Sequence, residues 1–469
     1  MPQYTLVKDA DVPALADAVL DVLKNVGVLC QNAEILDALE KVGAKVDRAN
    51  QIVKFPKAIT QKFVSQLRKE RGKPKPDAPQ PFPNVGLPVL GGQIAQFVYD
   101  HKAKEKRSGT SKDFIELIKL GDVLQDGAVG HCLLLTDVPP MIEPMEAAML
   151  LAEYARKPGK CFAWNVKQVD YLVEMGKILG IDDWFSWGAC CYAHPLRFDK
   201  DVADKFIPRA FGPSGAGLTA MPVAGVTTPV TTAGFIVVSS AEMLATWIAG
   251  RAVNPKAILY GSMWGASMDM KTGAVSYCMF DAMRHAFAMA DFMRKWTYMT
   301  ILVGGGEYCD AKVPGYYAAL EKAYKAMTIA AFTGRHPAIG QGMLEQGKTL
   351  SPVQLLLERE MSLGIQLWAK QVEVAPETIG MDAICDVGFG LNKSYIEADH
   401  TLDHFRSDTW LPPIMDRSGY TGINQEQAVL DRLQQKVDEL IAQYQKPAVD
   451  PDKLAKMRKV VERAKKELL

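Results

Sequence analysis

The sequence of 469 residues predicts an α/β protein, a (β/α)₈ TIM barrel with an N-terminal helical cap and a C-terminal helical extension. After residue 110, short apolar runs alternate with amphipathic helical patterns, which is typical of a parallel sheet covered by helices on both faces. Seven such units lie between residues 129 and 343, and this repetition favours a closed barrel over an open doubly wound sheet. No comparable run marks the eighth strand.

Residues 1–110 are expected to form the cap, together with a short hairpin and a linker. The apolar spacing predicts a first helix that ends at Gly27 and a second helix over 32–42. Alternation around the polar turn at Arg48 predicts a hairpin over 44–56, followed by a helix that begins near Pro56. The proline-rich stretch at 71–83 predicts a connector.

The barrel is expected over 111–424. Its predicted strands are VGHCLLL (129–135), KCFAW (160–164), WFSWGACCY (184–192), GLTAMPV (217–223), AILYGSM (257–263), WTYMTILVGG (296–305) and HPAIGQGM (336–343). Helical patterns lie between them, for example at 144–156, 241–252 and 317–332. Residues 425–469 are expected to form the helical extension, which ends in a locally basic tail.

Composition limits the class of function. Lys and Arg together number 54, as do Asp and Glu, so the net charge is zero and a nucleic-acid binder is not expected. One charge-free segment, 210–241, contains three prolines and predicts a buried strand with an uncharged loop rather than a membrane span. Eight cysteines without a CxxC pair, and an N-terminus unlike a signal peptide, predict a cytoplasmic protein with reduced thiols.

In a (β/α)₈ barrel, the reactive groups lie where each strand meets its following loop. Aromatic, methionine and amide side chains dominate those positions here. The set comprises Thr136, Asp137, Trp164, Asn165, Tyr192, His194, Met221, Met263, Trp264, Glu307, Tyr308, Gln341 and Glu345, with Tyr260 and Tyr277 near it in sequence. Trp and Tyr rings bind quaternary ammonium groups through cation–π attraction, at about 0.5–2 kcal/mol per ring. Packing in the core is the alternative role for each ring.

Other kinds of site find little support. The seven histidines form no HxH or HExxH pattern, so no metal site is expected. Neither GxSxG nor GxxxxGK[ST] occurs, and no GxGxxG opens a helix after a strand. Glu307 and Glu345 end neighbouring predicted strands and keep open a barrel hydrolase or lyase that uses two carboxylates.

Several long segments resemble the trimethylamine methyltransferase (MttB) superfamily. They are AMPVAGVTTPVTTAG (220–234), RAVNPKAILYGSMWGASMDMKTGA (251–274), GGGEYCDAKVPGYYAALEKA (304–323) and HTLDHFRSDTWLPPIMDRSGY (400–420), and the pattern at 20–56 is also similar. The segments follow in the family order along nearly the whole chain. Nothing in the sequence marks a pyrrolysine, so the chain resembles the branch without that residue, which includes glycine betaine:corrinoid methyltransferases.

The resemblance implies a barrel that moves a methyl group from a quaternary amine to cob(I)alamin on a separate corrinoid protein. Glycine betaine is the expected donor, and proline betaine, carnitine and γ-butyrobetaine are alternatives. Co(I) is a strong nucleophile and the departing tertiary amine is neutral, so neither a general acid nor zinc is required. The chain has no Asp-x-His, which the usual DxHxxG cobalamin motif needs, so cobalamin is expected in trans.

For this function, the sequence predicts a partial aromatic cage with one side open toward cobalt. Its expected rings are Trp164, Trp264, Tyr192 and Tyr308, with Tyr260 and Tyr277 as further candidates. The expected donors to the substrate carboxylate are Asn165, His194 and Gln341. Glu307 and Glu345 lie at the same strand ends and have no assigned role.

The uncharged loop at 210–234 is expected to face the corrin ring, through Gly225, Thr227 and Thr228. The expected partners are therefore a cognate corrinoid protein and a small zwitterionic amine, with no nucleic acid and no membrane. A homo-oligomer is expected. A betaine-binding protein without catalysis is the alternative from a different class of function.

Overall fold

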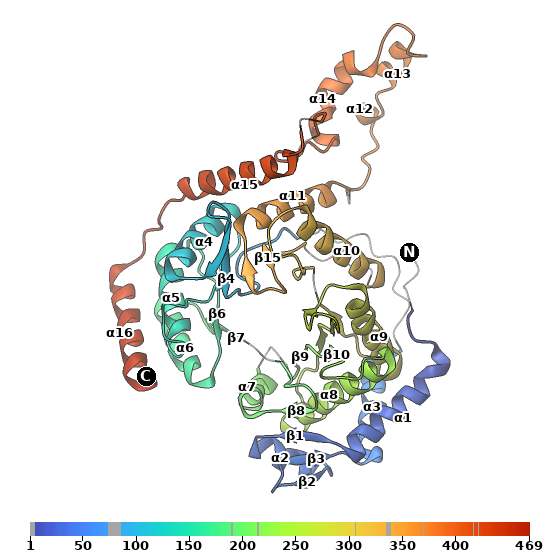
Figure 1. The fold of residues 1–469 in the computed structure, drawn as a ribbon, viewed down its shortest axis with the longest axis vertical. Helices are drawn as coiled ribbons and strands as arrows, with labels where there is room; N and C mark the ends of the chain where they lie inside the picture. The colour runs from blue at the N-terminus through green and yellow to red at the C-terminus, as the bar shows by residue number, and fades with distance from the viewer. Residues whose placement is uncertain are drawn as a thin grey trace.

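The computed structural model describes residues 5–73, 86–188, 191–212, 215–304, 306–333, 339–368, 370–415, 417–420 and 422–469. Helices lie on the outside and strands on the inside, and the elements follow one another around a ring (Figure 1). This arrangement confirms the α/β class.

The N-terminal part matches the predicted helices and hairpin. It contains η1 (Asp9–Asp11), α1 (Val12–Asn25), β1 (Val28–Cys30), α2 (Ala33–Lys41), β2 (Lys45–Asp47), β3 (Ile52–Lys54) and α3 (Lys57–Arg71). β2 and β3 pair antiparallel, and β1 pairs in parallel with β8 (Arg197–Phe198), which ties this part to the body. Gly27 ends α1 at φ 77°, where a Cβ atom would lie 2.1 Å from the carbonyl oxygen of Val53. Only glycine permits this close approach.

The body contains the remaining strands. They are β4 (Phe97–Asp100), β5 (Glu105–Ser108), β6 (Cys161–Ala163), β7 (Phe185–Trp187), β9 (Thr219–Ala220), β10 (Val223–Ala224), β11 (Ser262–Met263), β12 (Ala266–Met268), β13 (Val275–Ser276), β14 (Leu302–Val303), β15 (Met343–Leu344) and β16 (Thr349–Leu350). Each predicted run from 160 to 343 therefore contains at least one short strand, although residues 189–190, 305 and 336–338 of those runs lie outside the described residues.

The helices of the body alternate with these strands. They are α4 (Ser111–Leu124), α5 (Glu143–Tyr154), η2 (Val166–Gln168), α6 (Val169–Leu179), α7 (Lys200–Phe211), α8 (Thr232–Val253), α9 (Phe280–Thr297), α10 (Tyr316–Thr333) and α11 (Pro352–Trp368). The helices predicted at 144–156 and 317–332 are confirmed as α5 and α10. The helix predicted at 241–252 is α8, which begins nine residues earlier because the side chain of Thr231 caps it by accepting from the amide of Gly234.

A closed eight-stranded barrel is not confirmed, because the described strands form five separate sheets of two to four strands each. The strands are only two to four residues long, and the predicted strand at 129–135 contributes only isolated parallel bridges, Val129 to Pro158 and Leu133 to Ala95. β4, which lies inside the segment expected to be the cap, pairs in parallel with β16.

α8 is the one described helix that is long and apolar enough to cross a membrane by length and composition alone. In the fold, 78% of its apolar window is buried. It packs against α1, α2 and α9, so it serves as a core helix. The charge-free segment thus forms β9, β10 and a loop, as predicted, and then the start of α8.

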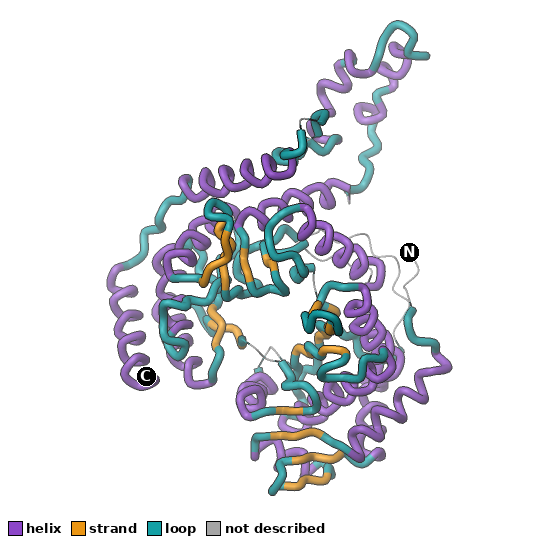
Figure 2. The backbone as a smooth tube through the Cα atoms, viewed as in Figure 1, coloured by secondary structure: helices purple, strands orange, loops and turns teal. Residues whose placement is uncertain are grey.

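Residues 425–469, which were expected to be helical, form α15 (Gln425–Ala442) and α16 (Pro451–Leu468). α15 packs on α4 and α11, while α16 packs on α5 and α6. Between α11 and α15, the chain leaves the body as an arm that contains α12 (Pro376–Ile379), α13 (Met381–Val387), η3 (Tyr395–Glu397) and α14 (Asp399–Asp408). Figure 2 shows the arm projecting away from the ring of strands and helices.

Candidate substrate site

Three aromatic rings meet at the ends of strands from the second half of the body. Trp264 follows β11, Tyr277 follows β13 and Tyr308 lies beyond β14. The ring centroids of Trp264 and Tyr308 are 5.0 Å apart in an edge-to-face arrangement, and those of Tyr277 and Tyr308 are 5.6 Å apart. The structure therefore brings together three of the six predicted cage rings, hereafter the aromatic cluster.

Two glycines allow these rings to lie directly against backbone. A Cβ atom on Gly304 would lie 2.9 Å from the Trp264 indole, and one on Gly347 would lie 2.3 Å from the Tyr308 ring. Gly347 also has φ 82°, which other residues rarely adopt. The local sequence thus fixes the positions of both rings.

Buried charges lie next to the aromatic cluster. Nζ of Lys325 lies 5.4 Å from the centroid of the Tyr308 ring, and both Lys325 and Glu307 are buried. Burial raises the pKa of Glu307 and lowers the pKa of Lys325, while the attraction between the two opposes both shifts. Burial also raises the pKa of the Tyr308 and Tyr277 phenols, so both rings stay neutral at physiological pH.

Two glutamines lie on the β4 side of Glu307. Nε2 of Gln93 donates to Oε1 of Glu307 at 3.4 Å. A Cβ atom on the neighbouring Gly92 would lie 3.0 Å from Oε1 of Gln341. That oxygen is buried and has no hydrogen-bond partner among the described residues. The unpartnered oxygen of Gln341 thus lies close to Gly92, the neighbour of Gln93. Gln93 itself was not among the residues predicted from the sequence.

His194 has both ring nitrogens occupied. Nε2 accepts from the backbone amide of Met221 at 2.9 Å, so the proton lies on Nδ1, which donates to Oε2 of Glu242 at 2.8 Å. Sγ of Cys191 lies 3.7 Å from Sδ of Met221. His194 therefore positions the backbone at Met221. Glu242 is the only acidic residue of α8. A single acid within an otherwise apolar helix is the sequence pattern that could have identified it as a buried, partnered residue.

Trp164 belongs to a separate group on the first half of the ring. Its Nε1 donates to Oε2 of Glu143 at 3.4 Å, and Oε1 of Glu143 is 2.9 Å from Nε2 of the buried His131. The indole packs against Gly188, where a Cβ atom would lie 2.5 Å from it. The side chain of Asn165 caps η2 by accepting from the amide of Lys167.

The other predicted residues have partners elsewhere. Tyr192 is buried and stacks on Phe198 in the core, with centroids 5.7 Å apart. The Tyr260 hydroxyl accepts from Arg209. Oε2 of Glu345 accepts from Lys106 at 2.8 Å, and among the described residues no contact joins Glu345 to Glu307.

The loop after β10 forms a tight turn with an apolar exterior. Gly225 has φ 86° and donates its amide to the carbonyl of Thr228 at 3.0 Å, while Oγ1 of Thr227 accepts from the amide of Val223. Val226 and Val230 are more than half exposed at this turn. These residues, 225–230, are called the β10 turn below.

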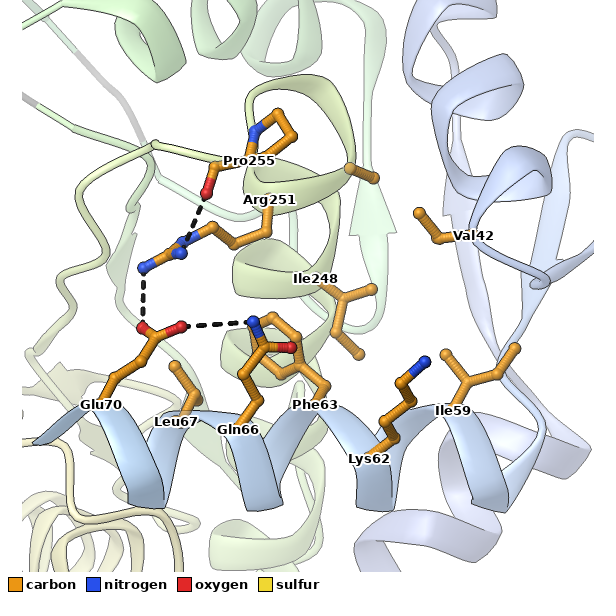
Figure 3. A pocket seen from close by; sticks show the side chains of 11 residues that line it. Val42, Ile59, Lys62, Phe63, Gln66, Leu67, Glu70, Ile248, Arg251 and Pro255 are labelled. Carbon is orange, nitrogen blue, oxygen red and sulfur yellow. Dashed lines mark hydrogen bonds and ion pairs between the residues drawn. The ribbon is translucent and has the colours of Figure 1, made fainter. Parts of the chain in front are cut away.

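A pocket of about 240 Å³ lies between α3 and α8 (Figure 3). Phe63, Leu67 and Ile248 supply its apolar wall, and Arg251 closes one end through an ion pair with Glu70 at 3.0 Å. None of the predicted site residues lines it, so it is separate from the aromatic cluster.

Comparison with known proteins was made over the whole chain. A family model described as trimethylamine methyltransferase (MTTB) matches residues 1–469. The chain is 26% identical over 430 residues to the trimethylamine methyltransferase MttB of Desulfitobacterium hafniense strain DCB-2, which covers 87% of this chain and 83% of the relative. It is 22% identical over 491 residues to the glycine betaine methyltransferase of Desulfitobacterium hafniense strain Y51, which covers 100% and 98%.

A relative from an archaeon matches a shorter part. The trimethylamine methyltransferase MttB2 of Methanosarcina mazei is 26% identical over 280 residues, which covers 58% of this chain and 54% of the relative. Since the family model extends over every residue, the chain belongs to the trimethylamine methyltransferase (MTTB) family.

Proposed function

We propose that the chain is a methyltransferase that moves a methyl group from a quaternary amine to cob(I)alamin carried by a separate corrinoid protein. Glycine betaine is the proposed donor, and the products are the tertiary amine and methylcob(III)alamin. Family membership supports methyl transfer from a methylated amine. The full-length similarity to a glycine betaine methyltransferase supports a betaine as the donor, ahead of proline betaine, carnitine and γ-butyrobetaine.

The observation that carries the proposal is the aromatic cluster in its buried surroundings. Neutral Tyr277 and Tyr308 phenols and the Trp264 indole offer π faces to a cation that cannot donate hydrogen bonds. The cation loses its charge as the methyl group leaves, so three rings that enclose it only in part stabilise the ground state less than a full cage. Orientation of the N–CH₃ bond and exclusion of water then lower the barrier.

Gln341 is the proposed partner of the substrate carboxylate. Its amide oxygen is buried without a hydrogen-bond partner among the described residues, and its Nε2 can donate two hydrogen bonds. Asn165 and His194 are weaker candidates, because the first caps η2 and the second has both nitrogens occupied. Lys325 supplies a positive charge near the same rings.

A (β/α)₈ barrel is the proposed framework. Parallel pairings or bridges join Ala95, which precedes β4, to Leu133, and also Val129 to Pro158, β6 to β7, Cys191 to β9, β9 to β11, β11 to β14, and Gly306 to Ile339. The β15–β16 hairpin then returns to β4. We propose that this succession returns to its starting strand, and that the ends of the parallel strands β11 and β14 point toward one face.

The β10 turn is the proposed contact for the corrinoid protein, with Gly225, Thr227 and Thr228 facing the corrin ring. Val226 and Val230 are exposed there, and Met270, 69% exposed, lies against Gly225. An uncharged surface with exposed apolar side chains suits a large planar ligand. A cytoplasmic homo-oligomer remains the proposed setting.

The test is to mix the chain with cob(I)alamin, free or on a corrinoid protein, and to follow formation of methylcob(III)alamin by visible absorbance. Glycine betaine should give conversion, and omission of the betaine is the matched control. Failure of every quaternary amine while cobalt stays reduced would overturn the proposal. Betaine binding without transfer, with the corrinoid protein present, would identify a binding protein instead.

A further inference from the structure

A second group of polar side chains lies behind the aromatic cluster. Cys278 follows β13, Asp310 follows β14, and Glu321 lies on α10. One potential ligand atom from each residue, a thiol sulfur and two carboxylate oxygens, lies within 4.8 Å of the other two. Cys278 is fully buried, Glu321 is 2% exposed, and Asp310 is partly exposed. These three residues are called the Cys–Asp–Glu cluster.

Glu321 carries the strongest sign of a missing ligand. Its Oε2 accepts from the backbone amides of Asp310 at 2.8 Å and Ala311 at 2.9 Å. Its Oε1 is buried and has no hydrogen-bond partner at ordinary distance among the described residues, and the Tyr317 phenol, whose pKa the Glu321 charge raises, is a neighbour of this carboxylate. A buried carboxylate oxygen without a partner costs more free energy than a neutral polar group in the same position. One oxygen of Glu321 is thus held rigidly while the other remains available.

The neighbouring groups hold the cluster in place. Oγ of Ser276 donates to Oδ2 of Asp310 at 2.7 Å and accepts from the backbone amide of Met279 at 3.1 Å. The same hydroxyl lies 3.7 Å from Sγ of Cys278. Such hydrogen bonds to ligand residues are what orients metal ligands in proteins.

No ion pair among the described residues balances the negative charge of the Cys–Asp–Glu cluster. Among the described residues, neither Asp310 nor Glu321 forms an ion pair with a lysine or arginine side chain. Lys325 is the cation that interacts electrostatically with Cys278. It also interacts with the Glu307 carboxylate and lies over the Tyr308 ring.

We propose that Cys278, Asp310 and Glu321 bind one divalent transition-metal ion, for which Zn²⁺ is the best match. A thiolate with two carboxylates suits zinc, whereas Mg²⁺ and Ca²⁺ require oxygen ligands only. Ligands of one zinc ion lie about 3.3–3.6 Å apart at Zn–S of about 2.3 Å and Zn–O of about 2.0–2.2 Å. The cluster reaches this spacing by a small contraction, and three protein ligands leave a fourth position open.

The bound ion would affect the aromatic cluster through residues adjacent to it in the sequence. Cys278 directly follows Tyr277, and Asp310 comes two residues after Tyr308. A metal ion that joins the loops after β13 and β14 through α10 would therefore fix two rings of the aromatic cluster. This inference concerns metal binding alone, so its test does not depend on whether the chain transfers a methyl group to cobalt.

The test is the metal content of the purified full-length chain, measured by inductively coupled plasma mass spectrometry after incubation with zinc and removal of excess. The expected result is about one zinc ion per chain. Cys278→Ser should reduce it to background. Cys309→Ser is the matched control, because Cys309 is an equally buried thiol nearby whose Sγ contacts the carbonyl of Met343 instead.

Cobalt(II) substitution gives a second readout. Thiolate coordination should produce an intense sulfur-to-cobalt absorption band that is absent from Cys278→Ser and weaker or shifted in Glu321→Gln, which preserves size and the backbone contacts. Absence of stoichiometric metal from the wild-type chain would overturn the proposal. Retention of metal by a folded Cys278→Ser variant would overturn it equally.

Discussion

Burial determines what the individual residues of the candidate site can do. Tyr277 and Tyr308 are partly buried, and burial raises the pKa of each phenol, so the rings present neutral faces. The rings of Trp264 and Tyr308 lie 5.0 Å apart in an edge-to-face arrangement rather than as a stacked pair. In a site with little water, attraction between these faces and a cation is stronger than it would be on an exposed surface.

Trp264→Ala should weaken the binding of glycine betaine more than the binding of 3,3-dimethylbutanoate. The second ligand has the same shape but a neutral carbon in place of the charged nitrogen. The difference measures the cation–π contribution, about 0.5–2 kcal/mol, or about 2- to 30-fold in Kd. Isothermal titration calorimetry with both ligands provides the comparison. Equal losses for the two ligands would assign Trp264 to packing alone.

Glu345→Gln should leave methyl transfer from the betaine unchanged. Glu345 accepts from Lys106 and Thr349, so we expect its carboxylate to hold these two side chains rather than to act on a substrate. Rates of methylcobalamin formation for the variant and the wild type are the measurement. A loss of more than about tenfold, equivalent to about 1.4 kcal/mol, would restore the two-carboxylate hydrolase or lyase hypothesis.

The sequence alone could identify strand-end residues but could not decide which way each side chain points. Trp264, Tyr277 and Tyr308 were predicted as cage rings and do lie together. Tyr192 and Tyr260 came from the same reasoning, yet their partners are Phe198 and Arg209. Successive side chains of a strand point to opposite faces, and both faces of these strands are covered, so hydrophobicity does not separate inside from outside. Glu242 was missed because its partner His194 is 48 residues away.

Among the elements, those with a strong local signal were predicted best. α1 and α2 have regular apolar spacing and end near glycines, and their bounds agree with prediction to within a residue or two. The start of α8 was missed because Thr232, Gly234 and nearby serines weaken its helical pattern. The run at 129–135 was predicted as a strand, but it forms only isolated bridges, since pairing depends on neighbours that the sequence does not reveal.

α4 provides a test at the level of one element. Thr110 and Asp113 form a capping box at its start, and Arg107 binds Asp113 through two hydrogen bonds of 2.7 Å. Burial raises the pKa of Asp113, but Arg107 and Thr110 outweigh it, so the pKa lies below its ordinary value. A carboxyl group with a lowered folded-state pKa stabilises the fold above its unfolded pKa of 3.8, and that stability is lost as the pH falls through the folded value.

Asp113→Asn should therefore lower the free energy of unfolding at pH 7 by about 1–3 kcal/mol, because hydrogen bonds to a charged group are lost. The difference from the wild type should shrink as the pH falls below 3.8, where the wild-type carboxyl also becomes protonated. Urea-induced unfolding, followed by circular dichroism at several pH values, measures the free energy of unfolding of the variant and of the wild type. Glu116→Gln, on an exposed face of the same helix, is the control and should change little at any pH. A pH-independent difference for Asp113→Asn would contradict the capping argument.

At the scale of the whole molecule, the arm between α11 and α15 stands out because its apolar side chains have no cover. Phe389 is 97% exposed, Leu391 86% and Ile396 83%. α10 also exposes an apolar row on its outer face, where Tyr317, Leu320 and Met327 are each at least 60% exposed. In one chain the arm projects away from α10 (Figure 1). Exchange of arms between two copies would cover both surfaces at once, as a two-fold interface does.

The chain should therefore be a dimer in solution, and Phe389→Ser with Ile396→Ser should shift it toward monomer. Full burial of each such side chain contributes about 1.5–3 kcal/mol, so the double variant should weaken each arm contact by about 3 kcal/mol or more, at least about 100-fold in Kd. Sedimentation velocity over a range of concentrations gives the mass. Val26→Ser, an exposed apolar residue at the end of α1, is the matched control and should leave the dimer intact. A wild-type chain that stays monomeric at micromolar concentration would contradict the exchange of arms.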